Sequence, residues 1–133
     1  NSYSDAIDID FSNISINKIA VNKAGNDCFD VSGGNYQIFQ AALRECGDKG
    51  VSVGESSNLT LSELNLISSN IGISSKDYSK VEVVRAQISN TYSCVEVRQK
   101  KQEFGGAYLA IEELNCNGKI EVDKDSVFKL GKQ

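Results

Sequence analysis

The chain has 133 residues, of which 40% are hydrophobic and 24% charged, a composition typical of one globular domain. It contains no proline, methionine, tryptophan or histidine, and its net charge at neutral pH is −4. Without histidine, Ser-His-Asp catalysis, Cys-His catalysis and zinc sites with a histidine ligand are excluded. The acidic balance argues against nucleic acid or an anionic membrane as partner, because both require a basic face, and no apolar run is long enough to span a membrane.

A repeat of 22 residues organises the chain into rows that begin at Asp5, Asp27, Lys49, Ile71 and Ser93. Near the start of each row, two apolar columns enclose a polar one. The first apolar column contains Ile7, Phe29, Val51, Ile73 and Val95, and the polar column contains Asp8, Asp30, Ser52, Ser74 and Glu96. This alternation of period two predicts a short strand repeated five times, with a sixth copy at Ile120-Glu121-Val122.

Two further sets of short apolar–polar–apolar segments follow in each row. The second set is Ile14-Ser15-Ile16, Tyr36-Gln37-Ile38, Leu59-Thr60-Leu61 and Val81-Glu82-Val83, with Phe104-Gly105-Gly106 as a weaker fifth member. The third set is Ile19-Ala20-Val21, Ala41-Ala42-Leu43, Leu64-Asn65-Leu66, Ala86-Gln87-Ile88 and Leu109-Ala110-Ile111. Asparagine and glycine tolerate left-handed backbone angles, so we expect the tight corners at Asn13, Asn35, Asn58, Gly25 and Gly47.

These rows predict a solenoid, because one row is too short to bury its own apolar face. Stacking rows about 4.8 Å apart lets each strand pair with its copies above and below. The absence of proline agrees with strands that are paired on both sides.

The four cysteines are expected to be small buried side chains rather than disulfides. No two of them have the C-x-x-C spacing of a metal or redox motif. Cys28 and Cys94 occupy the same column three rows apart, which is about 14 Å at the spacing of paired strands and too far for a bond.

The rows resemble the repeats of right-handed parallel β-helix proteins of the pectin-lyase-like family. The segments that carry the resemblance are Asn13-Ile14-Ser15-Ile16 with Gly25-Asn26-Asp27-Cys28-Phe29-Asp30-Val31, and Asn35-Tyr36-Gln37-Ile38 with Gly47-Asp48-Lys49-Gly50-Val51-Ser52-Val53. The resemblance implies an all-β, right-handed parallel β-helix solenoid of about five 22-residue coils with three short strands per coil. We expect residues 1–133 to form a single domain, cut from a longer solenoid.

A leucine-rich repeat is the rival fold. The segment Leu61-Ser62-Glu63-Leu64-Asn65-Leu66, followed by Asn70, imitates its core motif. That fold would require a helix opposite the motif, where the sequence instead has the alternating strand pattern, so the β-helix is favoured.

The candidate site is the polar column of the first strand with its flanking residues. Asp8, Asp10 and Asp30 are expected close together, and stacked carboxylates repel unless a cation or a proton intervenes. Oxygen ligands of this kind suit Ca²⁺, and the pectate lyases that the repeats resemble hold Ca²⁺ with acidic residues and use an arginine as base. Glu96 and Arg98 complete the candidate ligand-binding set, although Arg98 lies three rows from the aspartates.

Function is predicted only in outline. The favoured hypothesis is a non-enzymatic β-helix module that binds glycan or a cation, or serves adhesion or scaffolding, in a larger secreted or cell-surface protein. The alternative is a lyase or glycoside hydrolase that acts on acidic polysaccharide through an Asp-lined groove, although the absence of histidine removes the hydrolase signature of the family. The exposed strand edges of a solenoid also predict self-association by end-to-end stacking of coils.

Overall fold

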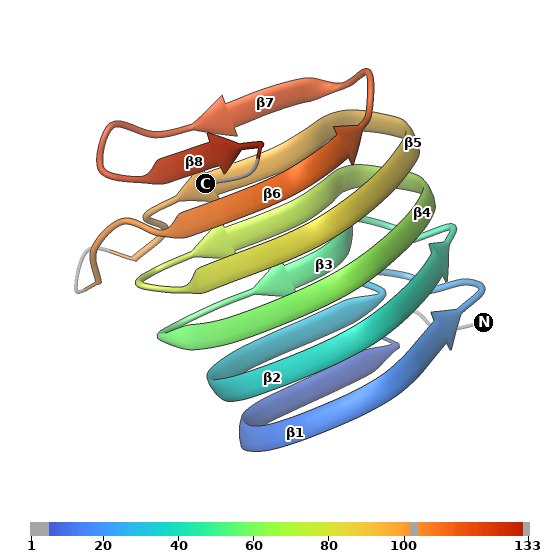
Figure 1. Cartoon of the computed structure of the whole chain (residues 1–133), viewed down its shortest axis with the longest axis horizontal. Coiled ribbons are helices and arrows are strands. Elements are labelled where there is room, and N and C mark those ends of the chain that lie inside the picture. Colours follow the sequence, from blue (N-terminus) through green and yellow to red (C-terminus); the bar gives the residue numbers. More distant parts are fainter. Residues whose placement is uncertain (1–5, 102–103, 132–133) are drawn as a thin grey trace.

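A computed structural model describes residues 6–101 and 104–131, and this part of the chain is a parallel β-solenoid of about six turns without any helix (Figure 1). Its strands are β1 (Ile7–Val21), β2 (Phe29–Arg44), β3 (Lys49–Val53), β4 (Ser57–Lys76), β5 (Lys80–Arg98), β6 (Tyr108–Asn115), β7 (Lys119–Val122) and β8 (Val127–Leu130). The all-β prediction is confirmed, and a leucine-rich repeat is excluded because no described segment is helical.

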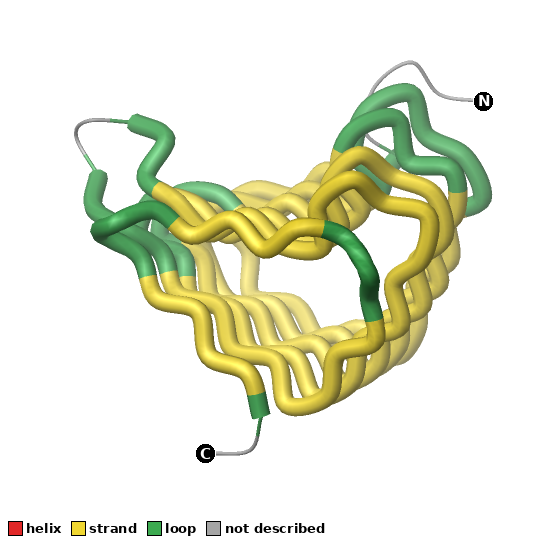
Figure 2. The backbone as a smooth tube through the Cα atoms, turned by 90° about the horizontal axis from the view of Figure 1, so that it is seen from above, coloured by secondary structure: helices red, strands yellow, loops and turns green. Residues whose placement is uncertain are grey.

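Three sheets wind around one core in a right-handed sense (Figures 1 and 2). The first sheet contains residues 7–10, 29–32, 49–53, 71–76, 93–98 and 119–122, and the second contains 13–16, 35–38, 58–61, 80–83, 108–111 and 127–130. The third contains 18–21, 40–44, 63–67, 85–89 and 113–115. The long strands bend around corners and therefore contribute to more than one sheet. We number coils one to six by their first-sheet segments.

The core consists of the inward columns that the repeat predicts. In the first sheet Ile7 pairs with Phe29, Phe29 with Val51 and Val51 with Ile73, so like side chains stack inside. Phe29, Val51 and Ile73 are at most 1% exposed. Burial of such stacked side chains is the main stabilising contribution, because no coil encloses a core alone.

The expected alignment of the fifth row is wrong. Val81 pairs with Leu109 and Ala86 with Leu114, so Leu109-Ala110-Ile111 lies in the second sheet and not in the third. The segment Phe104-Gly105-Gly106 precedes β6 and belongs to the corner before it. This corner is longer than its counterparts in the other coils, and its extra residues shift every later position away from the 22-residue period. With β7 and β8 the solenoid has about six coils, and β7 contains the sixth copy of the first strand that the sequence predicts.

The asparagines and glycines that the sequence suggested for the corners do not have positive φ angles. Positive φ angles occur instead at Phe11, Glu45, Ser56, Ser68, Asp77, Tyr78 and Asn90, and at Gly33, Gly34 and Gly131. Asn13, Asn35 and Asn58 form a ladder in which Nδ2 of Asn35 donates to Oδ1 of Asn13 at 3.0 Å and Nδ2 of Asn58 donates to Oδ1 of Asn35 at 2.9 Å. Gly47 is required by close stacking, since a Cβ there would lie 2.1 Å from the carbonyl oxygen of Gly25.

The expectation that the cysteines are unpaired is also wrong. Cys28 bonds to Cys46 and Cys94 to Cys116, with Cα–Cα distances of 5.3 and 6.1 Å. Cys28 and Cys94 do not meet, as expected, but each finds a partner at the corner between the third and first sheets. There the end of a coil returns beside its own start, so two residues 18 or 22 positions apart become neighbours.

Candidate functional site

The outer face of the first sheet carries all five residues that the sequence singled out. Its central column is continuous through six coils, with paired positions at Asp8, Asp30, Ser52, Ser74, Glu96 and Glu121. Asp10 and Arg98 lie two positions further along their strands, where Asp10 pairs with Ser32 and Arg98 with Lys76. The corners at both ends of the sheet project beyond this face (Figure 2).

The three aspartates lie on coils one and two, as expected. Asp8 and Asp30 are direct neighbours in the register, and Oδ1 of Asp10 accepts a hydrogen bond of 2.6 Å from the Ser32 hydroxyl. Among residues 6–101 and 104–131, however, no group of three His, Cys, Asp or Glu side chains is arranged to hold a metal ion. The Ca²⁺ site at Asp8, Asp10 and Asp30 therefore stays a prediction.

Glu96 and Arg98 form a separate cluster on coil five. Oε1 of Glu96 accepts hydrogen bonds from Nε of Arg98 at 2.9 Å and from the Ser74 hydroxyl at 3.2 Å. Three coil steps separate this pair from Asp30, or about 14 Å at the spacing of paired strands. The structure thus divides the predicted set into an acidic part and an ion pair.

Between these two clusters lies a buried lysine, Lys76, which is not among the candidate residues of the sequence analysis. Lys76 is 9% exposed, and its Nζ donates to the Ser52 hydroxyl at 3.2 Å, while Ser52 and Ser74 are almost fully buried. No carboxylate of the described residues is within ion-pair distance of this ammonium. An ammonium has three donors, so Lys76 has donor capacity that the described residues do not use.

Burial and the neighbouring charges together make protonation of Lys76 less favourable than it is for a lysine in water. Burial lowers the pKa of Lys76 below its usual value of 10.5, and the positive charges of Lys49 and Lys100 lower it further. Asp30 and Asp27 act in the opposite direction without cancelling the effect. The only signal in the sequence was the position of Lys76 in an outward column.

Lys49, in contrast, is paired. Its backbone N–H donates to Oδ1 of Asp27 at 3.0 Å, and its Nζ donates to Oδ2 of Asp48 at 2.8 Å. Burial would lower the pKa of Lys49, but the hydrogen bond to Asp48 and the charge of Asp27 raise it. Burial likewise opposes ionisation of Asp48, and the hydrogen bonds from Lys49 and Asn70 overcome it and lower the pKa of that carboxyl.

The protein is thus a parallel β-solenoid, and the outer face of its first sheet carries both acidic and basic side chains. Comparison of the chain with protein-family models, curated proteins and solved structures finds no match. The coil architecture agrees with the predicted β-helix fold, and no match supports membership of the pectin-lyase-like family. In the part of the chain that the structure describes, no helix has the length and apolar character needed to cross a membrane.

Proposed function

We propose that this chain is a non-enzymatic solenoid module that binds a glycan carrying anionic groups on the outer face of its first sheet. The observation that carries the proposal is the buried ammonium of Lys76, which has a hydroxyl partner but no carboxylate partner among residues 6–101 and 104–131. A buried charge without a counter-ion is unfavourable, and an incoming carboxylate or sulfate would supply that counter-ion together with acceptors for the free N–H donors.

The surroundings of Lys76 suit an extended polymer. Polar side chains recur along the first sheet at the coil spacing of about 4.8 Å, so successive groups of a chain that runs along the solenoid axis meet equivalent positions. The two disulfides are compatible with an oxidising compartment. They support the proposal that the module functions in a secreted or cell-surface protein.

The test compares a uronic-acid oligosaccharide with its methyl ester by isothermal titration calorimetry. We expect the acid to bind and Lys76→Gln to weaken binding about tenfold or more, because the variant keeps the side-chain length but loses the charge. The wild type should bind the ester as weakly as the variant binds the acid. Added salt should lower the affinity of the wild type for the acid, because it screens the ionic contact. Lys18→Gln, an exposed lysine of β1, is the control and should bind like the wild type. Equal binding of acid and ester, or no binding of either, would contradict the proposal.

Cation binding at the aspartates is the second part of the proposal, supported by the neighbouring positions of Asp8 and Asp30. Added Ca²⁺ should raise the unfolding temperature, because a ligand that binds only the folded chain stabilises it. The double variant Asp8→Asn with Asp30→Asn should abolish this rise. An unfolding temperature that does not change with Ca²⁺ would exclude the site.

Cleavage of an acidic polysaccharide is the alternative function, and one observation favours it. A lysine whose pKa is lowered by burial, such as Lys76, has a property that proton abstraction from a sugar ring requires. If the chain is a lyase, incubation with a polyuronate should release fragments with unsaturated ends, detected by ultraviolet absorbance, and Lys76→Gln should stop their release. A constant absorbance over long incubation would exclude this function.

End-to-end stacking of copies stays a proposal as well. Ile7, Ile9, Ile14 and Ile16 of β1 are only partly buried, and within the described residues β1 pairs with β2 alone. Sedimentation at increasing protein concentration tests stacking, which predicts a rising mass, while a constant monomer mass would exclude it.

A further inference from the structure

A second candidate site lies on a different face, at the end of the third sheet and the corner that follows it. A pocket of about 470 Å³ opens there, a size suited to a small ligand. Its lining consists of Asn65, Leu66, Ile67, Gln87, Ile88, Ser89, Asn90, Thr91, Asn115, Cys116, Asn117 and Gly118. None of these side chains is charged, although 24% of the residues in the chain are charged.

Four side-chain amides of the pocket have no hydrogen-bond partner within the described part of the chain. Asn65, Gln87 and Asn115 stack in register on coils three to five, and Asn117 lies in the next corner. Unlike the ladder on the second sheet, these stacked amides do not bond to one another, and none of the four takes part in any described hydrogen bond. They are surface groups with their full donor and acceptor capacity available.

One wall of the pocket is apolar. Ile67 is 44% exposed and pairs in register with Ser89, so an aliphatic surface lies next to the amides. A sugar ring presents the same combination, with C–H groups on its faces and hydroxyls at its edge. Amides match hydroxyls because both donate and accept hydrogen bonds.

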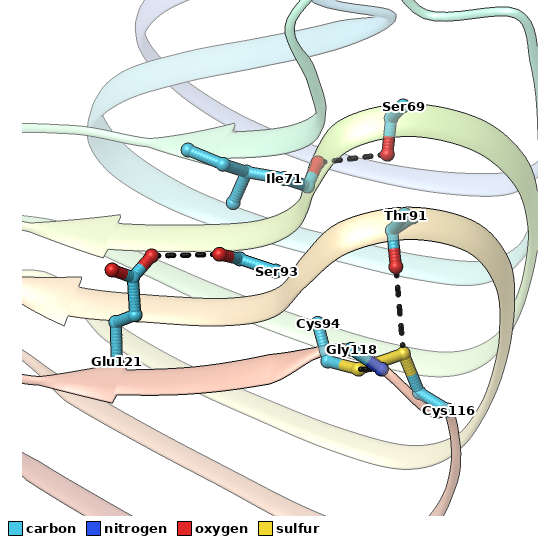
Figure 3. Close-up of a disulfide and its surroundings, with 8 residues drawn as sticks. All are labelled: Ser69, Ile71, Thr91, Ser93, Cys94, Cys116, Gly118 and Glu121. Carbon is cyan, nitrogen blue, oxygen red and sulfur yellow. Dashed lines mark hydrogen bonds between the residues drawn. A yellow bond between two sulfur atoms is a disulfide. The ribbon is translucent and has the colours of Figure 1, made fainter.

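The second disulfide holds the corner that contributes Cys116, Asn117 and Gly118 to the pocket lining (Figure 3). Cys116 lines the pocket and is bonded to Cys94, whose Sγ accepts a hydrogen bond of 3.0 Å from the backbone N–H of Gly118. The hydroxyl of Thr91 lies 3.5 Å from Sγ of Cys116. The corner that carries Asn117 is thereby tied to the coil below, and a wall ordered in advance reduces the entropy lost on binding.

We propose that this pocket binds a neutral saccharide unit through the amides of Asn65, Gln87 and Asn115, with Ile67 against the ring. The uncharged lining excludes the ionic recognition proposed for Lys76, which lies on the outer face of a different sheet. The proposal therefore goes beyond the proposed function, and either can fail without the other.

The experiment titrates the protein with a panel of neutral oligosaccharides built from glucose, galactose, mannose, xylose and their N-acetylated forms. Binding is followed by chemical shifts of the Asn and Gln side-chain amides in NMR spectra. We expect at least one member to bind at up to millimolar concentration and to shift the resonances of Asn65 and Gln87. Binding should be insensitive to salt, because no charge takes part.

Variants then separate the site from the fold. Asn65→Leu and Gln87→Leu should each weaken binding about tenfold, because each removes hydrogen bonds to the ligand. Gln40→Leu, on the outer face of the third sheet but outside the pocket lining, is the matched control and should bind like the wild type. Lys76→Gln should also leave neutral-sugar binding unchanged. The proposal is overturned if no panel member binds at millimolar concentration, or if binding survives the two leucine variants.

Discussion

Lys76 and Ser52 lie on adjacent coils, and their hydrogen bond of 3.2 Å joins two side chains that are buried although both belong to the outward columns of a sheet. Outward positions of a solenoid face water by default, so burial there means that neighbouring side chains cover them. Lys76 contacts the Ser52 hydroxyl and has no ion-pair partner among the residues that the structure describes. The free chain therefore retains an unfavourable charge at the face that we propose as its binding surface.

Replacing this lysine with an apolar residue should not destabilise the unliganded protein. A buried charge without a counter-ion has lost hydration that one hydroxyl does not restore. We expect Lys76→Met to be as stable as the wild type at neutral pH, or more stable by roughly 1 kcal/mol in urea unfolding. Lys18→Met serves as the control for a loss of charge at an exposed site. A clear loss of stability in Lys76→Met alone would mean that its ammonium is stabilising.

The same lysine predicts how stability depends on pH. Its folded pKa is lowered below the usual 10.5, so in the window between the two values the unfolded chain binds more protons than the folded one. Stability therefore rises with pH through this window. We expect the difference in unfolding free energy between the wild type and Lys76→Met to move in favour of the wild type as pH increases toward 10.5. A difference that stays constant over this range would contradict the lowered pKa.

The two disulfides should contribute about equally to stability but differ in how readily they are reduced. Their sequence separations of 18 and 22 residues correspond to about 3 kcal/mol each in the loop-entropy description. Cys28 and Cys46 are both buried, whereas Cys116 is partly exposed at the pocket. With increasing reductant, alkylation followed by mass spectrometry should detect Cys94 and Cys116 first. Earlier labelling of Cys28 and Cys46 would refute this order.

The fold was predictable because every coil repeats the same signal. An apolar column such as Phe29, Val51 and Ile73 identifies a buried strand without knowledge of its partners, and five copies define the stack. The fifth row was misaligned because its inserted corner breaks the period, and the Gly105-Gly106 pair lies in that corner rather than in a strand.

The site was less predictable because it depends on which side chains cover others. The alternation places Asp8 and Lys76 alike on the outer face, but it does not show that Lys76 is buried and Asp8 exposed. The disulfides were missed for a related reason. Aligning the rows compares the distances only between cysteines of the same column, such as Cys28 and Cys94. Cys46 belongs to a different column, and it bonds to Cys28 across a corner.

Close stacking at the corners can be tested with two glycines that do not have positive φ angles. At Gly47 a Cβ would lie 2.1 Å from the carbonyl oxygen of Gly25, whereas at Gly54 the nearest atoms are 3.7 Å away. Gly47→Ala should cost about 2 kcal/mol or more, because backbone must move to admit the methyl group. Gly54→Ala should change stability by less than about 0.5 kcal/mol. Equal effects in thermal unfolding would show that the coils adjust at Gly47.

The two stacks of amides on the outer faces should respond differently to the same substitution. Asn35 donates to Asn13 and accepts from Asn58, so Asn35→Ala removes two hydrogen bonds and should cost roughly 1 kcal/mol in urea unfolding. Asn65 is equally part of a strand, but its amide makes no described hydrogen bond, so Asn65→Ala should change stability by less than about 0.5 kcal/mol. A stabilising role for Asn65 equal to that of Asn35 would mean that its amide serves the fold. In that case it would not be available for a ligand, and the saccharide pocket would lose one of its three proposed contacts.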